Sequence, residues 1–288
     1  MSTGKPIAVG TNDSAQSQAA VAWAARRAER ANVPLVIVHV VDDRWLAAAR
    51  PWVEALQDTG NKLLKDAAGR ARESFPIEII TKLMTGSVGG SLRKYSGKTS
   101  MLVVGSGSGH LGGSLTDLAL QVAAAAKCPV AVIGTQDLDG RHGIVVGVDG
   151  SEESIQSVAF AAAEADRDGQ ELTVLHAFSG PDRLVDAGLT PDNLAGLIVE
   201  EERIVLAETV AGLREDYPDL IVNKVLEARK GPVEALLEAS TEAKMLVVGS
   251  RGRGGFRRLL LGSTAHGVLT HLPCPTVITR VQRIKHQA

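Results

Sequence analysis

The chain has 288 residues, of which 44% are hydrophobic and 22% charged, with a formal net charge of -2. These values are typical of a globular protein with one large or two medium domains, and they give no reason to expect nucleic acid or an anionic membrane as a partner. The sequence MSTGKPIAVG enters a strand without a signal-peptide core, and no apolar run approaches the roughly 18 residues of a membrane span. We therefore expect a cytoplasmic protein that binds neither nucleic acid nor membranes.

In the first half of the chain, short apolar runs alternate with segments of helical periodicity. Such alternation implies parallel strands joined by right-handed crossovers, in a sheet covered by helices on both faces. The expected strands are Pro6–Thr11, Leu35–Val41, Ile77–Leu83, Met101–Ser106 and Val130–Ile133, and the expected helices are Ser14–Ala31, Pro51–Ser74, Val88–Ser96 and Leu115–Ala126.

The second half repeats the same alternation. Leu246, Val247 and Val248 form a run too uniformly apolar for a sheet with a wet face, which indicates a buried parallel strand. The expected strands are Gly143–Val148, Leu172–Phe178, Ile221–Glu227, Met245–Ser250 and Thr276–Thr279, and the expected helices are Ser151–Asp168, Asp192–Asp216, Pro232–Glu242 and Ser263–His271.

The helix that begins near Ser151 has a recognisable start and an apolar face. Ser151 is a plausible N-cap, because a serine side chain there accepts from a backbone N–H of the first turn. The spacing i, i+3, i+4, i+7 predicts that one face packs on the core. The residues of this predicted core face are Ile155, Val158, Ala159 and Ala162.

The two halves are homologous. IAVGTNDS from Ile7 matches IVVGVDGS from Ile144, and MLVVGS occurs at Met101 and again at Met245. The two cysteines, Cys128 and Cys274, stand at matching places, and we expect buried thiols rather than the alternative disulfide between them. The repeat predicts two tandem α/β domains with parallel open sheets, over residues 1–136 and 143–288, joined by the polar segment TQDLDGRHG.

The segment MLVVGSRGRGGFRRLLLGST, residues 245–264, has the character of a phosphate-binding loop. Four of the seven residues from Gly249 to Gly255 are glycine, so main-chain N–H groups can converge on an anion. Arg251 and Arg253 add positive charge, and Ser263 and Thr264 stand at an expected helix start, where the helix dipole favours an anion. A solvated connecting loop is the alternative interpretation.

A second element of the expected site is the end of the first strand of this half. Parallel open sheets bind ligands beyond the carboxyl ends of strands, where the strand order reverses. Asp149 stands there and supplies a carboxylate for an exocyclic amine or a ribose hydroxyl. His39 and His176 occupy matching places in the second strand of each half, and we interpret both as structural.

Gly249, Gly252, Gly262 and Ser263 match G-x2-G-x9-G-[ST], the ATP-binding signature of the universal stress protein family, and the first-strand segment Val146–Ser151 also resembles that family. The resemblance covers nearly the whole chain, in the tandem form common in actinobacteria. It implies five-stranded sheets of order 3-2-1-4-5 and a pseudo-dimer of the two halves through their fifth strands. A further homodimer of whole chains stays open, and the protein partner is unknown.

The resemblance also implies a nucleotide site in the second half. Asp149 would meet adenine or ribose, Ala177 would border adenine, the glycine-rich loop would wrap the phosphates, and Mg2+ would arrive with the nucleotide. No residue is expected to be catalytic or to bind a metal by itself. The implied site residues are Gly147, Val148, Asp149, Ala177, Gly249, Ser250, Arg251, Gly252, Arg253, Gly254, Gly255, Gly262, Ser263 and Thr264.

The first half departs from the signature. Asn12 replaces the aspartate, Ser108 occupies the second glycine position, and the loop arginines are missing. We therefore expect the first half to bind ATP weakly or not at all. The leading hypothesis is an ATP-binding regulator or signalling module of a stress response that is not an enzyme. A slow Mg-dependent ATPase and a nucleotide-independent scaffold are the alternatives.

Overall fold

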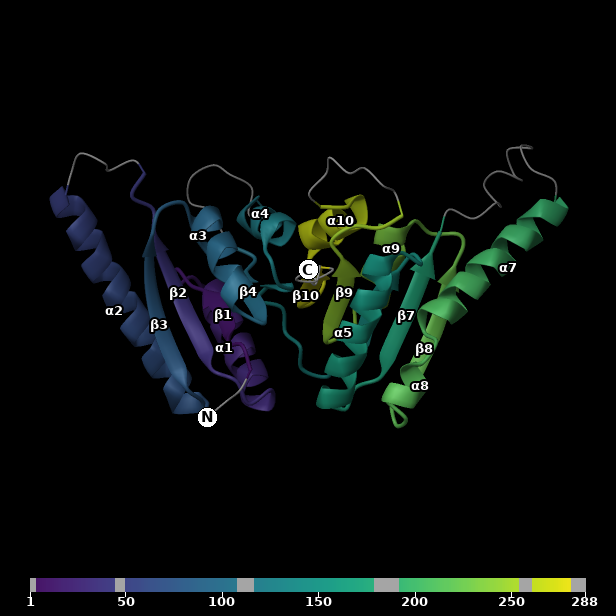
Figure 1. Cartoon of the computed structure of the whole chain (residues 1–288), viewed down its shortest axis with the longest axis horizontal. Coiled ribbons are helices and arrows are strands. Elements are labelled where there is room, and N and C mark those ends of the chain that lie inside the picture. The colour runs from purple at the N-terminus through teal and green to yellow at the C-terminus, as the bar shows by residue number, and fades with distance from the viewer. Residues whose placement is uncertain (1–3, 45–49, 108–116, 179–191, 254–260, 281–288) are drawn as a thin grey trace, which may run out of the picture. The chain divides into compact units, whose positions relative to one another are not determined.

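The computed structural model describes residues 4–44, 50–107, 117–178, 192–253 and 261–280. The chain divides into two compact units, Met1–Thr135 and Gln136–Ala288. Each unit is an α/β fold in which strands and helices alternate along the chain (Figure 1).

The N-terminal unit contains a parallel sheet of order β3-β2-β1-β4-β5. Ile7 of β1 lies opposite both Leu35 of β2 and Met101 of β4, so β1 is the central strand. The described elements are β1 (Ile7–Gly10), α1 (Ala15–Arg30), β2 (Leu35–Val41), α2 (Arg50–Ser74), β3 (Ile79–Thr85), α3 (Val88–Tyr95), the 3-10 helix η1 (Ser96–Lys98), β4 (Met101–Gly105), α4 (Asp117–Ala125) and β5 (Val130–Ile133).

The C-terminal unit repeats this topology with the order β8-β7-β6-β9-β10, all parallel. The strand order 3-2-1-4-5 expected within each half is therefore confirmed. The described elements are β6 (Ile144–Val148), α5 (Glu152–Asp168), β7 (Leu172–Ala177), α7 (Asp192–Thr209), α8 (Leu213–Asp216), β8 (Val222–Glu227), α9 (Pro232–Ala239), β9 (Met245–Gly249), α10 (Ser263–His271) and β10 (Thr276–Thr279).

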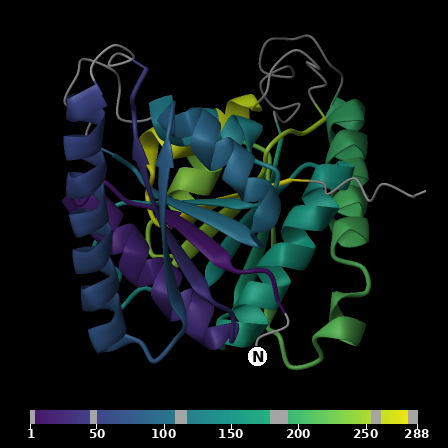
Figure 2. The ribbon, with the colours of Figure 1, turned by 60° about the vertical axis from the view of Figure 1, so that its left-hand side comes forward.

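Helices cover both faces of each sheet, because right-handed crossovers that run in opposite directions from the central strand place their helices on opposite faces. In the C-terminal unit α5 packs with α7, and α9 packs with α10. α2 lies beside β2 and β3, and α7 lies beside β8 (Figure 2). The central strands are consequently buried along most of their length, as their uniformly apolar sequences predict.

Two details of the predicted helices are wrong. The expected helix Asp192–Asp216 is interrupted before α8, where Gly212 adopts a left-handed φ of 83° that a continuing helix does not allow. The predicted core face of α5 is also out of phase, since Ile155 is 53% exposed and Ala159 is exposed, whereas Val158 and Ala162 are buried.

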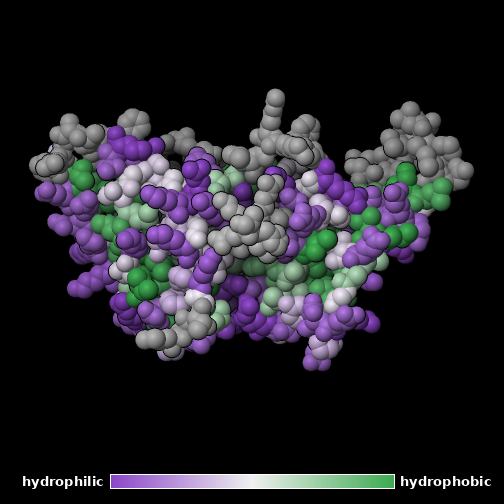
Figure 3. Space-filling model, viewed as in Figure 1, coloured by the Kyte–Doolittle hydropathy of each residue, from purple (hydrophilic) through white to green (hydrophobic). Residues whose placement is uncertain are grey.

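The inward face of α5 includes small polar residues that an apolar pattern cannot indicate. Ser154 and Ser157 are buried, and Ser157 shares a 2.6 Å hydrogen bond with the hydroxyl of Thr279. A single exposed isoleucine such as Ile155 is ordinary for a folded surface. Hydrophilic residues cover most of the visible face, with hydrophobic ones between them (Figure 3).

Candidate functional site

A pocket of about 480 Å³ lies at the carboxyl ends of β6 and β9. The chain leaves β6 toward β7 on one side and returns to β9 on the other, so the pocket lies where the strand order reverses. All of its lining residues belong to the C-terminal unit. Its volume falls within the range of about 300–1,000 Å³ that small-molecule sites occupy.

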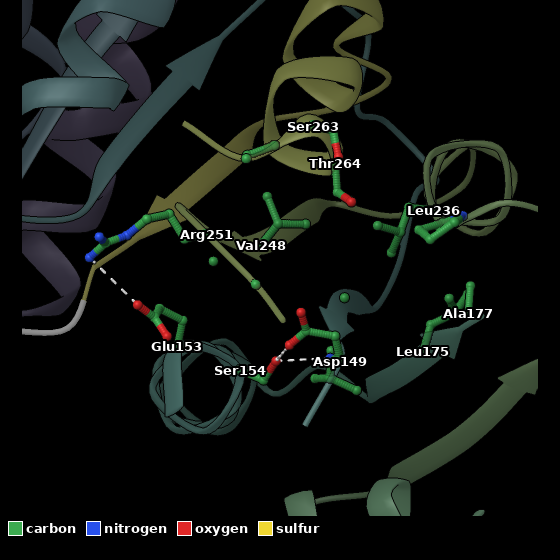
Figure 4. Close-up of a pocket in the computed structure, with 17 residues that line it drawn as sticks. Asp149, Glu153, Ser154, Leu175, Ala177, Leu236, Val248, Arg251, Ser263 and Thr264 are labelled. Atoms are coloured by element: carbon green, nitrogen blue, oxygen red, sulfur yellow. Dashed lines mark hydrogen bonds and ion pairs between the residues drawn. The ribbon is translucent and has the colours of Figure 1, made fainter. Parts of the chain in front are cut away.

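The pocket has an apolar end and a polar end (Figure 4). Leu175, Ala177 and Leu236 lie together on one side, whereas Arg251, Ser263 and Thr264 come from the loop and the start of α10. Asp149 projects between these ends from the turn after β6. Such a division suits an amphipathic ligand with an apolar ring and an anionic tail.

Most of the residues predicted from the sequence line this pocket. They are Gly147, Val148, Asp149, Ala177, Gly249, Arg251, Gly252, Gly262, Ser263 and Thr264. Ser250 is instead buried behind the loop, where its carbonyl accepts the Gly262 N–H at 2.8 Å. Gly254 and Gly255 lie outside the described residues.

Sequence reasoning missed the parts of the wall that come from the starts of α9 and α5, from β7 and β9, and from the first turn of α10. Val248 and Ala265 are neighbours of the motif in the sequence, whereas the spacing of the loop glycines does not indicate the others, because the fold brings them to the pocket. The missed lining residues are Glu153, Ser154, Leu175, Pro232, Leu236, Val248 and Ala265.

The carboxylate of Asp149 is held by several donors. Oδ1 accepts from the Ser154 hydroxyl at 2.5 Å and from the Ser151 N–H at 3.1 Å, and Oδ2 accepts from the Arg253 N–H at 2.6 Å. Burial by itself would raise the pKa of Asp149, but the hydrogen bonds from Ser151, Ser154 and Arg253 outweigh it and the pKa is lowered. The carboxylate is therefore charged at neutral pH and fixes the loop to the end of β6.

This lowered pKa makes the stability of the C-terminal unit depend on pH. A carboxyl group with a lower pKa in the folded than in the unfolded state stabilises the fold above its ordinary value of 3.8, and loses that contribution as the pH falls through its folded pKa. We expect Asp149→Asn to lower the free energy of unfolding by roughly 1.5–3 kcal/mol at pH 7, with a deficit that shrinks below pH ~4.

Urea unfolding of this variant and the parent between pH 3 and pH 7 measures the effect. Asp219→Asn, which removes the same charge at an exposed position, is the control. A deficit for Asp149→Asn that stays constant over the whole pH range would contradict the role assigned to the carboxylate.

Glycine allows close approaches at two positions of the pocket wall. A Cβ placed on Gly252 would lie 2.0 Å from the Asp149 Oδ2, and a Cβ on Gly147 would lie 2.9 Å from a methyl group of Leu236. A side chain at either position would force Asp149 or Leu236 to shift from its place in the pocket wall. The glycines of the motif thus allow the loop and the end of β6 to line the pocket with main chain.

The polar end combines a helix start with the side chain of Arg251. Ser263 begins α10, a helix of nine residues, and Thr264 follows it; both line the pocket. The guanidinium of Arg251 lies 3.6 Å from the Glu153 carboxylate and its side chain is 49% exposed. Unpaired N–H groups at a helix start together with an arginine form a suitable anion site.

Arg253, also predicted for the site, does not line the pocket. Its backbone N–H donates to Asp149, and its Nη1 lies 3.2 Å and 3.1 Å from the two carboxylate oxygens of Glu202 on α7. Glu202 also contacts the Nε2 of His176 at 2.6 Å. His176 is buried, as a structural histidine should be, but its carboxylate partner is 26 residues away and was not recognised from the sequence.

The matching turn of the N-terminal unit keeps the backbone arrangement with different side chains. The Asn12 side chain accepts from the Ser14 N–H at 3.2 Å, as Asp149 accepts from the Ser151 N–H. Asp13, which replaces Gly150, adopts a φ of 65° and pairs with Arg70. The loop that follows β4 lies partly outside the described residues, so the weak or absent binding expected there stays a prediction.

The comparison with known proteins agrees with this repeated fold. The model of the universal stress protein family matches residues 4–134 and, a second time, residues 140–280. The chain belongs to the universal stress protein family. The tandem arrangement that the resemblance implied is thereby confirmed.

Several mycobacterial members of the family are similar over nearly their whole length. Universal stress protein Rv2623 of Mycobacterium tuberculosis is 34% identical over 289 residues, which span 95% of this chain and 96% of the relative. A universal stress protein of Mycolicibacterium smegmatis is 33% identical over 293 residues, with the same two shares. These relatives agree with the actinobacterial tandem type that the resemblance implied.

The fold of universal stress proteins is also found among solved structures. A universal stress protein from Archaeoglobus fulgidus superimposes with a TM-score of 0.70 at 19% identity, over 96% of this chain and 99% of that one. This likeness concerns the fold.

Within the described part of the chain, no helix combines the length and the apolar character needed to cross a membrane.

Proposed function

We propose that the C-terminal unit of this universal stress protein binds ATP in the pocket between β6 and β9, and that the bound nucleotide regulates the protein. One observation carries the proposal. Gly249, Gly252, Gly262 and Ser263, which form the ATP-binding signature in the sequence, all line one pocket at the point where the strand order reverses.

The two ends of the pocket suit the two ends of the nucleotide. Adenine fits against Leu175, Ala177 and Leu236, because an aromatic base is best buried on apolar side chains. Asp149 offers a charged acceptor to a ribose hydroxyl or the exocyclic amine. This arrangement places the base near β7 and the sugar at the end of β6.

The phosphates then lie along the loop and the start of α10. Main-chain N–H groups near Gly252 and Gly262, the hydroxyls of Ser263 and Thr264, and the guanidinium of Arg251 are the donors on this side. Mg2+ arrives bound to the phosphates and neutralises part of their charge. The protein supplies the cradle and the orientation.

A regulatory role follows from what the site offers chemically. Asp149 accepts its hydrogen bonds as a charged, structurally engaged carboxylate, which makes it a binding group rather than a proton carrier. Binding of ATP stabilises the loop conformation that the nucleotide prefers, and that shift in population is the signal to a protein partner. The existence of a protein partner, a homodimer of whole chains and the cytoplasmic location stay predictions.

The stoichiometry of bound nucleotide tests the proposal. We expect freshly purified protein, saturated with Mg-ATP and freed of excess ligand, to release one ATP per chain, measured by mass spectrometry. The reason is that Asn12 and Ser108 replace residues of the signature in the N-terminal half. Release of two ATP molecules per chain would contradict the asymmetric site, and saturation without any bound nucleotide would favour a nucleotide-independent scaffold.

A slow Mg-dependent ATPase is the second candidate, and the hydroxyls of Ser263 and Thr264 at the polar end of the pocket favour it. These hydroxyls could orient a metal-bound phosphate, while Arg251 could stabilise developing charge. Repeated turnover of ATP that falls with Ser263→Ala would favour the enzyme. Binding without repeated turnover favours the regulator.

A further inference from the structure

A continuous chain of contacts connects the glycine-rich loop to the outer helix α7. The Nδ1 of His176 lies 2.8 Å from the Val148 carbonyl, and its Nε2 lies 2.6 Å from the Oε2 of Glu202. Glu202 in turn holds the Nη1 of Arg253. Because Val148 and Asp149 are adjacent and Asp149 accepts the Arg253 N–H, the contacts close into a ring around the end of β6.

Glu202 and Arg253 differ in their exposure. The side chain of Glu202 is 18% exposed, and that of Arg253 is 45% exposed. The buried ring of His176 holds the carboxylate, whereas the partly exposed guanidinium lies beside Gly150 in the turn after β6. Because the guanidinium is nearly half exposed, solvent screens its ion pair with Glu202 and the pair breaks at little cost.

Comparison with the N-terminal unit shows which features of the C-terminal unit occur together with Glu202. His39 repeats the contact of His176, since its Nδ1 lies 2.8 Å from the Thr11 carbonyl. Against that ring lies Gly60 of α2, where an added Cβ would be 2.9 Å from Cδ2 and 3.4 Å from Nε2. Counted from the glycine that ends β4, Gly109 stands where Arg253 stands.

Glu202 could serve either to support His176 or to hold Arg253, and the comparison of the two units distinguishes these roles. The histidine and its bond to the strand carbonyl are present in both units, so they do not depend on a glutamate on the helix. The glutamate is present in the half whose loop has the arginine. Its role therefore concerns the arginine of the phosphate-binding loop and not the support of the histidine.

We propose that Glu202 is a specificity-determining residue that competes with the phosphates of the bound nucleotide for Arg253, so that the site selects nucleotides by their number of phosphates. This inference rests on the proposed binding of ATP. A triphosphate with several negative oxygens attracts the guanidinium more strongly than one carboxylate does. Adenosine has no phosphate and therefore no negative charge to attract it. Arg253 therefore leaves Glu202 for ATP and stays with it in the presence of adenosine.

The exchange also transmits occupancy away from the pocket. When Arg253 turns to the phosphates, α7 loses its tie to the loop, while Glu202 keeps its contact with His176. The segment of α7 around Glu202 then opens more readily, because fewer contacts oppose its local unfolding. A partner that contacts α7 can detect this change.

Calorimetric titration of the full chain with Mg-ATP and with adenosine tests the competition. We expect Glu202→Gln to tighten ATP binding roughly threefold to tenfold, because the neutral amide releases Arg253, and to leave adenosine binding unchanged. Glutamine retains an acceptor for His176. The matched control is Glu200→Gln on the same helix, which removes the same charge from an exposed carboxylate 3.4 Å from Arg203.

A double-mutant cycle assigns the effect to the pair. In the Arg253→Gln background, Glu202→Gln should change the ATP affinity by less than about 1.5-fold, because the competition has lost its other partner. Hydrogen exchange in α7 should accelerate on ATP binding in the parent and be independent of ATP in Glu202→Gln. Thermal unfolding of each variant reports whether the fold is retained.

The outcomes distinguish this inference from the function on which it rests. If the parent binds no ATP, both the proposed function and the competition are wrong. If the parent binds ATP but Glu202→Gln weakens that binding, the proposed competition is wrong and the proposed function stands. The same conclusion follows if Glu202→Gln raises the affinities for ATP and adenosine equally. A gain of the same size in Glu200→Gln would also overturn it, because it would reduce the effect to the net charge of α7.

Discussion

Gly252→Glu should lower the affinity of the chain for ATP about hundredfold, which corresponds to about 2.7 kcal/mol. A Cβ at this position would lie 2.0 Å from the Oδ2 of Asp149, so the carboxylate or the loop must shift and the contact between them is disturbed. The new carboxylate would also face Asp149 and the phosphates, and like charges about 4 Å apart near a protein surface repel by about 4 kcal/mol.

Calorimetric titration with Mg-ATP measures this loss, and Gly196→Glu is its matched control. Gly196 belongs to α7, has nothing within 4 Å of an added Cβ, and receives the same charge in the control. The control should bind ATP within about twofold of the parent, since a single exposed charge contributes little. An unchanged affinity for ATP in Gly252→Glu would show that the loop does not take part in ATP binding.

Gly150→Ala should destabilise the C-terminal unit by about 3 kcal/mol through two separate effects. Gly150 has a φ of 76°, a left-handed conformation that costs other residues about 1–2 kcal/mol. An added Cβ would lie 2.4 Å from a methyl group of Val205 on α7 and 2.6 Å from the Arg253 guanidinium. The long side chain of Arg253 can move away from an added Cβ. Val205 cannot, because its short β-branched side chain is fixed to the helix backbone.

Gly140→Ala separates these effects, because Gly140 has a φ of 77° and nothing within 4 Å of an added Cβ. The control should lose about 1 kcal/mol and show the conformational cost alone. All three tryptophans lie in the first half, so hydrogen exchange of β6 and β7 during urea unfolding is the suitable measurement. Equal losses in the two variants would show that the contact with Val205 has no energetic weight.

The turn after β1 shows that the left-handed position tolerates another residue in a suitable environment. Asp13 occupies it with a φ of 65°, pairs with Arg70, and accepts the Gln18 side-chain amide. Aspartate is among the few residues that adopt this conformation at modest cost. The C-terminal unit favours glycine there because a methyl group of Val205 occupies the adjacent space.

The sequence by itself determined the architecture of both units and indicated residues that line the candidate pocket. Uniformly apolar runs such as Leu246–Val248 predict parallel strands, because only a sheet covered on both faces buries every residue of a run. The loop glycines and Asp149 were found for a related reason. They are adjacent to strand ends, and the carboxyl ends of parallel strands meet at one edge of the sheet.

Only the tertiary structure decided which side chains complete the site. Leu236 and Glu202 come from helices that the fold brings to the pocket and the loop, and their spacing from the motif carries no signal. The inward face of α5 was missed because Ser154 and Ser157 are polar yet buried, each satisfied by a hydrogen bond to a distant or turn residue. The periodicity of a sequence reflects only how hydrophobic each residue is. A polar residue can still be buried where the folded chain provides it with a hydrogen-bond partner.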